Sequence, residues 1–432
     1  MYRYAILELY KWKNKRNRKP LIIEGARQVG KTWLMREFGK EAYDNTVYIN
    51  FDSNRQMSEL FAADLNIDRI ILGMELYTGK KINPENTLII FDEVQEVPKA
   101  LSSLKYFYEN APQYNIICAG SLLGIALHEG TSFPVGKVEF LRLYPLSFKE
   151  FLLATGNERF ASLLDNRDFD MITSFRQTYI DALKYYYFVG GMPEAVLEFA
   201  EEKDFNEVRN IQKRILDAYE QDFSKHAPNE IVPRIRMLWN SIPSQLAKEN
   251  KKFIYGIIRE GARAKEYEAA IMWLSDCGLV HKVSRITKPN LPLKAYEDLK
   301  AFKLFLLDVG LLGCMTGLRQ QTLLGGNDLF VEFKGALTEQ YVLQQLAAIP
   351  ELSVYYYTNE RNSCEIDFLI DNGEMVIPVE VKAEANLMAK SLKTYNVKYN
   401  PDICIRTSMA DYKREDWLVN LPLYAISEIN TI

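Results

Sequence analysis

Residues 25–32 read G-A-R-Q-V-G-K-T and directly follow an apolar run at residues 21–23. The pattern G-x-x-x-x-G-K-T forms a phosphate-binding loop, because its glycines let the backbone curl until several N–H groups point at one anion. Residues 33–38 continue with helical apolar spacing, so bound phosphates would lie at a helix N-terminus. The chain is therefore predicted to bind ATP in a strand–loop–helix unit.

Four side chains are predicted to carry ATP hydrolysis. Lys31 would reach the outer phosphates, and Thr32 would offer its hydroxyl to Mg²⁺. Asp92 and Glu93 follow the apolar run at residues 88–91, at the edge where a parallel sheet binds its ligand. Asp92 would hold Mg²⁺ beside Thr32, and Glu93 would orient the attacking water. The alternative for Asp92 is the N-cap of the next helix.

Ser121 is a further candidate, because it follows the apolar run at residues 115–119. Its hydroxyl is placed to sense the γ-phosphate, although a plain turn serine fits the same pattern. The residues predicted to bind the nucleotide are Gly25, Ala26, Arg27, Gln28, Val29, Gly30, Lys31, Thr32, Asp92 and Ser121.

Five continuous apolar runs alternate with helical patterns in the first third of the chain. A parallel sheet covered on both faces requires such runs, because neither face of its strands meets water. The runs are residues 21–23, 47–51, 88–91, 115–119 and 138–143. This part is therefore predicted to be a doubly wound α/β fold, a P-loop NTPase sheet.

Composition limits the remaining choices. A chain of 432 residues exceeds one compact core, so several domains are expected. The net charge of −4 argues against a protein that coats nucleic acid, and any such site must be local. The five scattered cysteines suggest neither zinc nor disulfides. With no signal peptide and no apolar span of sufficient length, we expect a cytoplasmic protein without membrane contact.

The middle of the chain reads as helical. Residues 156–228 are predicted to form a helical lid. Residues 229–290 suit a winged helix-turn-helix, in which the alternating segment 279–285 is the wing strand. Lys282, Arg285 and Lys288 would then lie on or near the wing. Contact with nucleic-acid phosphates and a merely solvated wing both remain open.

A hairpin is predicted near the C-terminus, with strands at residues 365–370 and 375–382. A two-residue turn of Asn372 and Gly373 would place Asp367 opposite Pro378. The side-chain period of two then gathers four charged residues on one face. They are Glu365, Asp367, Glu380 and Lys382. Three crowded carboxylates repel each other unless a cation lies between them. A solvated sheet face with a Glu–Lys pair is the alternative.

Several motifs occur in an order that resembles a known family, bacterial and archaeal P-loop ATPases of the AAA type with a C-terminal domain of uncertain function. The motifs are the phosphate loop, F-D-E-V-Q at 91–95, A-G-S at 119–121, Y-P-L-S-F-K-E-F at 144–151 and G-G-M-P-E-A at 190–195. The resemblance covers essentially the whole chain. It implies an enzyme, an ATPase that uses ATP and Mg²⁺.

The C-terminal acids resemble those of restriction-endonuclease-like (PD-(D/E)XK) nucleases, whose pattern is Asp, a gap, then Glu-x-Lys. The resemblance implies that Asp367 and Glu380 coordinate Mg²⁺ or Mn²⁺, and that Lys382 orients the attacking water. Glu339 matches the acid that such folds carry on a preceding helix. The catalytic set implied for the whole chain is Lys31, Glu93, Glu339, Asp367, Glu380 and Lys382.

One departure from the family concerns the arginine finger. Relatives commonly carry Gly-Arg before the fifth strand, where this chain has Gly136 and Lys137. Lys137 would replace the charge of a finger but not its bidentate fork, so we expect slow turnover. A homo-oligomer could supply the finger from a neighbouring subunit.

These expectations divide the chain into four domains: a P-loop ATPase at 1–155, a helical lid at 156–228, a winged helix-turn-helix at 229–290 and a nuclease-like domain at 291–432. The leading hypothesis is an ATPase that acts on DNA, with the last domain cutting or gripping it. The alternative is a nucleotide-dependent regulatory switch, in which a non-cleaving C-terminal domain binds a partner or DNA.

Overall fold

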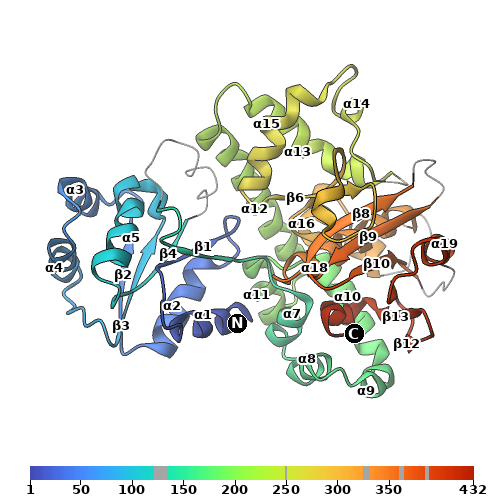
Figure 1. Ribbon diagram of the computed structural model, residues 1–432, viewed down its shortest axis with the longest axis horizontal. Coiled ribbons are helices and arrows are strands. Elements are labelled where there is room, and N and C mark those ends of the chain that lie inside the picture. The colour runs from blue at the N-terminus through green and yellow to red at the C-terminus, as the bar shows by residue number, and fades with distance from the viewer. Residues whose placement is uncertain (121–133, 249–250, 325–330, 360–363, 385–388) are drawn as a thin grey trace. The chain divides into compact units, whose positions relative to one another are not determined.

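The computed structural model describes residues 1–120, 134–248, 251–324, 331–359, 364–384 and 389–432 (Figure 1). The chain divides into two compact units. The N-terminal unit comprises Tyr2–Tyr144 with Asp276–Gly278, and the C-terminal unit comprises Met1, Pro145–Ser275 and Leu279–Ile432.

The N-terminal unit is built on a five-stranded parallel sheet in the order β2-β3-β4-β1-β5 (blue to teal in Figure 1). The strands are β1 (Leu21–Glu24), β2 (Asn45–Asn50), β3 (Thr87–Asp92), β4 (Asn115–Ala119) and β5 (Glu139–Arg142). The inner strands β3 and β4 are buried along their whole length, as their apolar sequences require. The prediction of an α/β fold with a parallel sheet is confirmed.

Three helices of this unit begin at residues that favour a helix N-terminus. Asn54 and Asn66 accept the N–H groups of Met57 and Arg69 at the starts of α3 and α4, while α5 begins at Pro98. The helices are α1 (Ala5–Lys13), α2 (Lys31–Ala42), α3 (Arg55–Ala63), α4 (Ile67–Thr78), α5 (Pro98–Asn110) and the short 3₁₀ helix η1 (Val94–Glu96). Helix α2 starts directly from the phosphate loop.

The C-terminal unit contains an eight-stranded mixed sheet in the order β12-β13-β11-β10-β9-β8-β6-β7. The strands are β6 (Val280–Ile286), β7 (Glu297–Leu306), β8 (Ser353–Thr358), β9 (Glu365–Asp371), β10 (Val376–Val381), β11 (Cys404–Ser408), β12 (Lys413–Arg414) and β13 (Leu418–Pro422). Strands β8, β9 and β10 form an antiparallel meander, and β11 runs parallel to β10.

The expected wing strand is part of this sheet. Strand β6 pairs with β7 antiparallel and with β8 in parallel, so the expected boundary at residue 290 falls inside a hairpin. Val280, Val283 and Ile286 of β6 are buried, which is more apolar contact than an exposed wing would give. The alternating pattern identified a strand correctly but did not reveal its partners.

The helices of the C-terminal unit surround the sheet elements and include the segment expected as a helical lid. They are α7 (Phe148–Ala154), α8 (Glu158–Asp165), α9 (Phe169–Ser174), α10 (Arg176–Val189), α11 (Pro193–Glu201), α12 (Phe205–His226), α13 (Val232–Leu246), α14 (Tyr255–Ile258), α15 (Ala264–Asp276), α16 (Val309–Met315), α17 (Gln320–Leu324), α18 (Val331–Ala347), α19 (Lys390–Tyr399), and the 3₁₀ helices η2 (Leu293–Tyr296) and η4 (Leu423–Thr431).

The G-G-M-P-E-A motif has a packing role. Gly190 has a φ of 73°, and a Cβ there would lie 2.1 Å from Oδ1 of Asp308. The N–H of Gly191 donates to Oδ2 of Asp308 at 2.6 Å, and Gln344 Nε2 donates to the same oxygen at 2.9 Å. Asp308 is completely buried, and burial raises the pKa of its carboxyl. The two glycines therefore allow the chain to pass directly over a buried acid.

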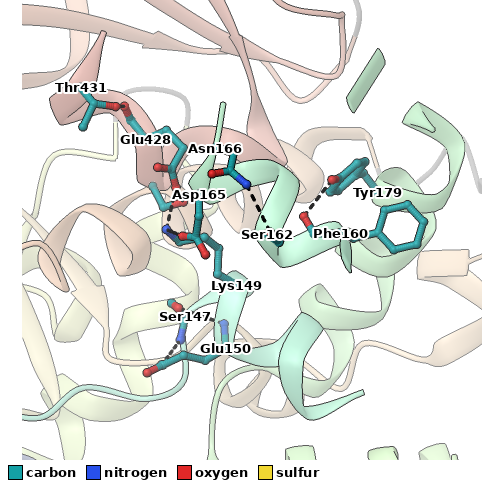
Figure 2. Close-up of polar contacts among 11 residues, drawn as sticks. Ser147, Lys149, Glu150, Phe160, Ser162, Asp165, Asn166, Tyr179, Glu428 and Thr431 are labelled. Carbon is teal, nitrogen blue, oxygen red and sulfur yellow. Dashed lines mark hydrogen bonds and ion pairs between the residues drawn. The ribbon is translucent and has the colours of Figure 1, made fainter. Parts of the chain in front are cut away.

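The motif at residues 144–151 contacts the last helix of the chain, η4 (Figure 2). Ser147 and Glu150 form a capping box at the start of α7. Lys149 donates to Asp165 of α8 at 2.7 Å and approaches Glu428 of η4 at 2.8 Å. One lysine thus joins the consecutive helices α7 and α8 to η4, which is distant in sequence.

Candidate functional site

The phosphate loop is shaped by three residues with positive φ angles. These angles are 147° at Gly25, 67° at Gln28 and 93° at Gly30. A Cβ at Gly25 would lie 2.3 Å from the carbonyl oxygen of Leu143, so no other residue fits there. The loop therefore leads from β1 into α2 with the curled backbone that a phosphate site requires.

Lys31 lies inside this loop and is only 6% exposed. Its ammonium donates to the carbonyl oxygens of Gly25 and Ala26, both at 2.8 Å. Burial lowers the pKa of Lys31 to about 8, although the charges of Glu93 and Asp92 act in the opposite direction. Because both acceptors are neutral, a phosphate oxygen would be a stronger partner for this ammonium.

The structure brings Thr32 and Asp92 together at the end of β3. Thr32 Oγ1 donates to Asp92 Oδ2 at 2.7 Å, and the hydroxyl of Tyr48 on β2 donates to the same oxygen at 2.8 Å. The guanidinium of Arg36 lies 3.9 Å from the centre of the Tyr48 ring. A buried carboxylate beside a hydroxyl fits the Mg²⁺ role expected for this pair.

Tyr48 is a site residue that the sequence analysis missed. It lies between the buried Val47 and Ile49 of β2, so the alternation of the strand alone would call it a solvent-facing residue. The alternative role of Asp92, a helix N-cap, is not observed: η1 has Glu93 at its N-cap position and α5 has Val97, neither with a side-chain cap.

Glu93 has a left-handed backbone conformation, with a φ of 50°. Such a conformation costs a non-glycine residue on the order of 1 kcal/mol and is concentrated at functional sites. Gln95 Nε2 donates to Glu93 Oε2 at 2.7 Å. Gln95 thus orients the carboxylate that is predicted to position the attacking water, which gives the last residue of F-D-E-V-Q a physical role.

Arg3 supports the loop from outside the motif. It is 4% exposed and donates to the carbonyl oxygen of Val29 at 2.9 Å and to that of Tyr144 at 2.6 Å. No local pattern in the sequence marks this contact, because residue 3 is distant from both acceptors. Ser121, the expected sensor, lies outside the described residues.

The two cations near β5 lie at opposite edges of the sheet. Lys137 precedes β5 and pairs with Glu109 at 3.0 Å. Since the strands are parallel, Lys137 belongs to the amino edge, away from the phosphate loop of its own chain. Arg142 ends β5 at the carboxyl edge, where it pairs in register with Glu24 and approaches its carboxylate at 3.9 Å. Arg142 was missed because no motif contains it.

In the C-terminal unit, the register of the β9–β10 hairpin differs from the prediction. Asp371 pairs with Val376 and Phe368 with Val379, so the loop has four residues and not two. The side chain of Asn372 accepts the N–H groups of Glu374 and Met375, which stabilises the longer loop. The register shifts by two, so each residue keeps its face, but its continuation places Asp367 opposite Glu380 instead of Pro378.

The carboxylates around this hairpin are paired with lysines. Lys251 Nζ lies 2.6 Å from Glu339 Oε1. Lys303 Nζ lies 2.8 Å from Glu365 Oε1 and 3.8 Å from Glu339 Oε2, and its side chain is only 1% exposed. Nearby on β10, Lys382 pairs with Glu380 at 2.7 Å. We call Glu339, Glu365, Asp367 and Glu380 the carboxylate cluster.

Asp367 is the acid of this cluster that lies opposite Glu380 and accepts a backbone hydrogen bond. It accepts the N–H of Val381 at 2.8 Å. Burial and the charge of Glu339 raise the pKa of Asp367 to about 7, against the opposing effect of Lys303 and Lys251. A carboxyl with this pKa carries its proton for part of the time at neutral pH.

The cluster does not match a divalent metal site. Across the described ranges, no three His, Cys, Asp or Glu side chains gather closely enough to hold a metal ion. Glu339 Oε2 and Glu380 Oε2 are buried without a hydrogen-bond partner there. The cation that the sequence analysis required between the carboxylates is supplied by lysine side chains, which lie too far away in sequence for the hairpin pattern to reveal them.

Two of the three expected wing cations, Lys282 and Arg285, have partners within the chain. Arg285 pairs with Asp298 of β7 at 2.5 Å, and Lys282 Nζ lies 4.9 Å from the centre of the Phe302 ring. These contacts are those of a paired sheet strand, so they give no support to the nucleic-acid reading of this segment.

Three family models match consecutive parts of the chain. Residues 17–152 match the AAA domain, residues 180–322 match a domain of unknown function (DUF8612), and residues 334–426 match another domain of unknown function (DUF4143). The first match agrees with the phosphate loop and the parallel sheet, and it identifies the N-terminal unit as a P-loop ATPase domain of the AAA type.

Solved structures give only distant similarities. A Walker-type ATPase of Pyrococcus abyssi is 15% identical, with a TM-score of 0.46, over 72% of this chain and 94% of that one. The Aeropyrum pernix ORC1 protein, solved in complex with DNA, is 12% identical, with a TM-score of 0.29, over 74% and 93%. The Thermotoga maritima RuvB Holliday junction branch migration motor is 13% identical, with a TM-score of 0.27, over 64% and 86%. Likenesses of this strength carry no functional conclusion.

A comparison with curated proteins finds no match. Within the ranges that the structure describes, no helix combines the length and the apolar character needed to cross a membrane.

Proposed function

We propose that this P-loop ATPase of the AAA type uses ATP to act on DNA, which its C-terminal unit grips without cutting. The observation that carries the second half of this proposal is the buried ammonium of Lys303, which lies between Glu365 and Glu339. It favours gripping over cutting, the two activities that the sequence left open for the C-terminal acids.

The residues of the N-terminal unit support ATP hydrolysis in the roles expected of them. Lys31 would hold the outer phosphates, and Thr32 with Asp92 would hold Mg²⁺, which neutralises phosphate charge when bound. Glu93, oriented by Gln95, would position the attacking water. Lys137 lies at the amino edge of the sheet, which supports donation of its charge to a neighbouring copy and not to its own site.

Cutting DNA in the nuclease-like way requires a divalent cation between Asp367 and Glu380. Three acids of the carboxylate cluster already have lysine partners: Glu339 pairs with Lys251, Glu365 with Lys303 and Glu380 with Lys382. A metal ion between Asp367 and Glu380 would bring its charge close to the buried ammonium of Lys303, whose charge already acts on Asp367, and this repulsion is unfavourable. We therefore derive no metal-dependent step for the C-terminal unit.

Two features support DNA as the proposed partner. Helix α18, the β8–β10 meander, α19 and β11 follow one another with the acids at the positions that the nuclease resemblance implies. Helix α19, which packs on β9 and β10, exposes Lys390, Lys393 and Lys398 and contains no acidic residue. Exposed lysines of this kind contact phosphates without reading sequence.

Two assays on the full chain test the proposal. Duplex DNA should stimulate ATP turnover, and Lys31→Ala or Glu93→Gln should abolish that turnover while leaving DNA binding measurable. In Mg²⁺ or Mn²⁺, wild type should nick supercoiled DNA no faster than Asp367→Ala or Lys382→Ala does. If DNA does not change the rate of ATP turnover, the proposed coupling between ATP hydrolysis and DNA is wrong. If wild type nicks DNA in a metal-dependent way and Asp367→Ala does not, the proposal that the C-terminal unit grips DNA without cutting it is wrong.

A further inference from the structure

A second basic site lies in the C-terminal unit, remote in sequence from the phosphate loop and the carboxylate cluster. A pocket of about 480 Å³ is formed by the end of α10, the start of α12, the end of α16 and residues 317–321. Its described lining contains three basic side chains and no Asp or Glu. The residues on which the argument depends are Arg209, Lys213, Arg319, Phe188, Phe205 and Cys314.

Arg209 brings a charge into this pocket, and no carboxylate of the described residues forms an ion pair with it. Its guanidinium donates to Gln212 Oε1 at 2.6 Å and to the carbonyl oxygens of Leu318 at 2.9 Å and Gly310 at 3.3 Å. It also lies 4.1 Å from the centre of the Phe188 ring. Burial lowers the pKa of Arg209, against the opposing effect of the neighbouring Cys314. Neutral acceptors fix its position but leave the charge uncompensated.

Lys213 and Arg319 add two exposed cations to the lining of the same pocket. Neither forms an ion pair with the residues that the structure describes. Two nearby acids lie outside the lining: Glu207 pairs with Arg214 at 3.0 Å, while burial and the charge of Asp217 raise the pKa of Cys314. The pocket is thus a concave concentration of positive charge.

We propose that this pocket binds a phosphate group. A planar, pre-positioned guanidinium with two lysine or arginine neighbours is the arrangement that recognises phosphate oxygens. The volume lies in the range of small-ligand pockets, and Phe188 and Phe205 provide aromatic walls beside the cations. The phosphate comes from either a free nucleotide or a nucleic-acid strand. This site goes beyond the proposed function and stands even if the chain does not act on DNA.

Binding to the full chain with Lys31→Ala tests the site, because that change disables the phosphate loop as a competing site. Calorimetric titration with pyrophosphate, ATP and a short single-stranded oligothymidine provides the two arms. The test variant adds Lys213→Gln and Arg319→Gln, two exposed residues whose loss leaves Arg209 and its carbonyl contacts in place. The matched control adds Lys225→Gln and Arg234→Gln, exposed residues of α12 and α13 with the same change in net charge.

The proposal predicts that the test pair weakens binding about tenfold or more, while the control pair changes it little. If pyrophosphate and ATP show this loss, the source is a free nucleotide. If only the oligothymidine shows it, the source is a nucleic-acid strand. Equal weakening by both pairs would mean that net charge alone attracts the ligand, and that result, or no binding of any probe, overturns the proposal.

Discussion

The two acidic sites of this chain use their carboxylates in opposite ways. Asp92 in the N-terminal unit accepts hydrogen bonds from the hydroxyls of Thr32 and Tyr48, which are neutral groups. Glu339 and Glu365 in the C-terminal unit face the ammonium groups of Lys251 and Lys303. Hydroxyl partners orient a carboxylate but leave its charge available for a metal ion, whereas lysine partners neutralise it.

This contrast teaches that acid motifs do not establish a metal site by themselves. Both sites carry acids at the spacing that a metal-dependent enzyme needs, at the end of β3 in one unit and within β9 and β10 in the other. The two sites differ in the charge of the groups that contact those acids in the folded chain. The following predictions test this difference.

The largest effect is expected at the phosphate loop of the N-terminal unit, where the charge of Asp92 remains available for a metal ion. Lys31→Ala removes the cation predicted to meet the outer phosphates, so ATP turnover should fall about 10²-fold or more. Measured turnover and nucleotide affinity of the full chain check this. Thermal unfolding without nucleotide should stay close to wild type, and near-normal turnover would show that the phosphate loop is not the ATP site.

Lys303, the buried cation of the carboxylate cluster, should affect the stability of the fold and not ATP turnover. Lys303→Met removes the partner of Glu365 and Glu339 and leaves buried charge unpaired, so unfolding should become easier by about 3–5 kcal/mol. Lys300→Met, an exposed lysine on the same strand, is the matched control and should change little. If denaturant unfolding finds the two variants equally stable, the lysine is not the cation that the cluster requires.

The pH dependence of stability follows from Asp367. Its pKa is raised to about 7 by burial and by Glu339, above its value of about 4 in an unfolded chain. The stabilisation from its bound proton is therefore fully present below about pH 4 and is lost as the pH rises through 7. Asp367→Asn removes the charge but keeps an oxygen for the N–H of Val381. The variant should gain stability relative to wild type between about pH 5 and pH 8.5.

Thermal unfolding of both proteins across this pH range provides the measurement. A difference between them that stays constant, or that shrinks toward high pH, would mean that Asp367 is not a buried acid of raised pKa in the folded protein.

The smallest effect is expected at Tyr48. Tyr48→Phe removes one hydrogen bond to Asp92 but leaves the strand intact, so the Mg²⁺ concentration for half-maximal turnover should rise roughly threefold to tenfold. Tyr43→Phe, which removes a hydroxyl bonded to Asn115, is the matched control. Saturating Mg²⁺ should restore turnover in Tyr48→Phe. A loss that Mg²⁺ does not repair would assign Tyr48 a purely structural role.

Local features of the fold were predictable from the sequence. Strands β1 to β4 each contain a short apolar run, whereas β5 (Glu139–Arg142) has a charged residue at each end and is not buried. The phosphate loop fixes both its own turn and the start of α2. The register of the β9–β10 hairpin was predicted incorrectly because the Asn-Gly pair suggested a two-residue turn. In the structure the side chain of Asn372 stabilises a four-residue loop.

The long-range features of the candidate sites could not be predicted. Tyr48 was missed because its position in β2 predicts a solvent-facing side chain. Arg3 contacts the phosphate loop but lies in the first residues of the chain, outside the motif. Lys251 and Lys303 reach the carboxylate cluster from segments that share no pattern with it. Each contact depends on tertiary packing, which a motif search does not see.

The central claim is that the N-terminal acids take a metal ion and the C-terminal acids do not. Electron paramagnetic resonance can count the Mn²⁺ ions that the full chain binds with and without a non-hydrolysable ATP analogue. The account predicts a single Mn²⁺ that requires the nucleotide, is lost in Asp92→Ala and is unaffected by Asp367→Ala. A Mn²⁺ ion that binds without nucleotide and disappears in Asp367→Ala would contradict it.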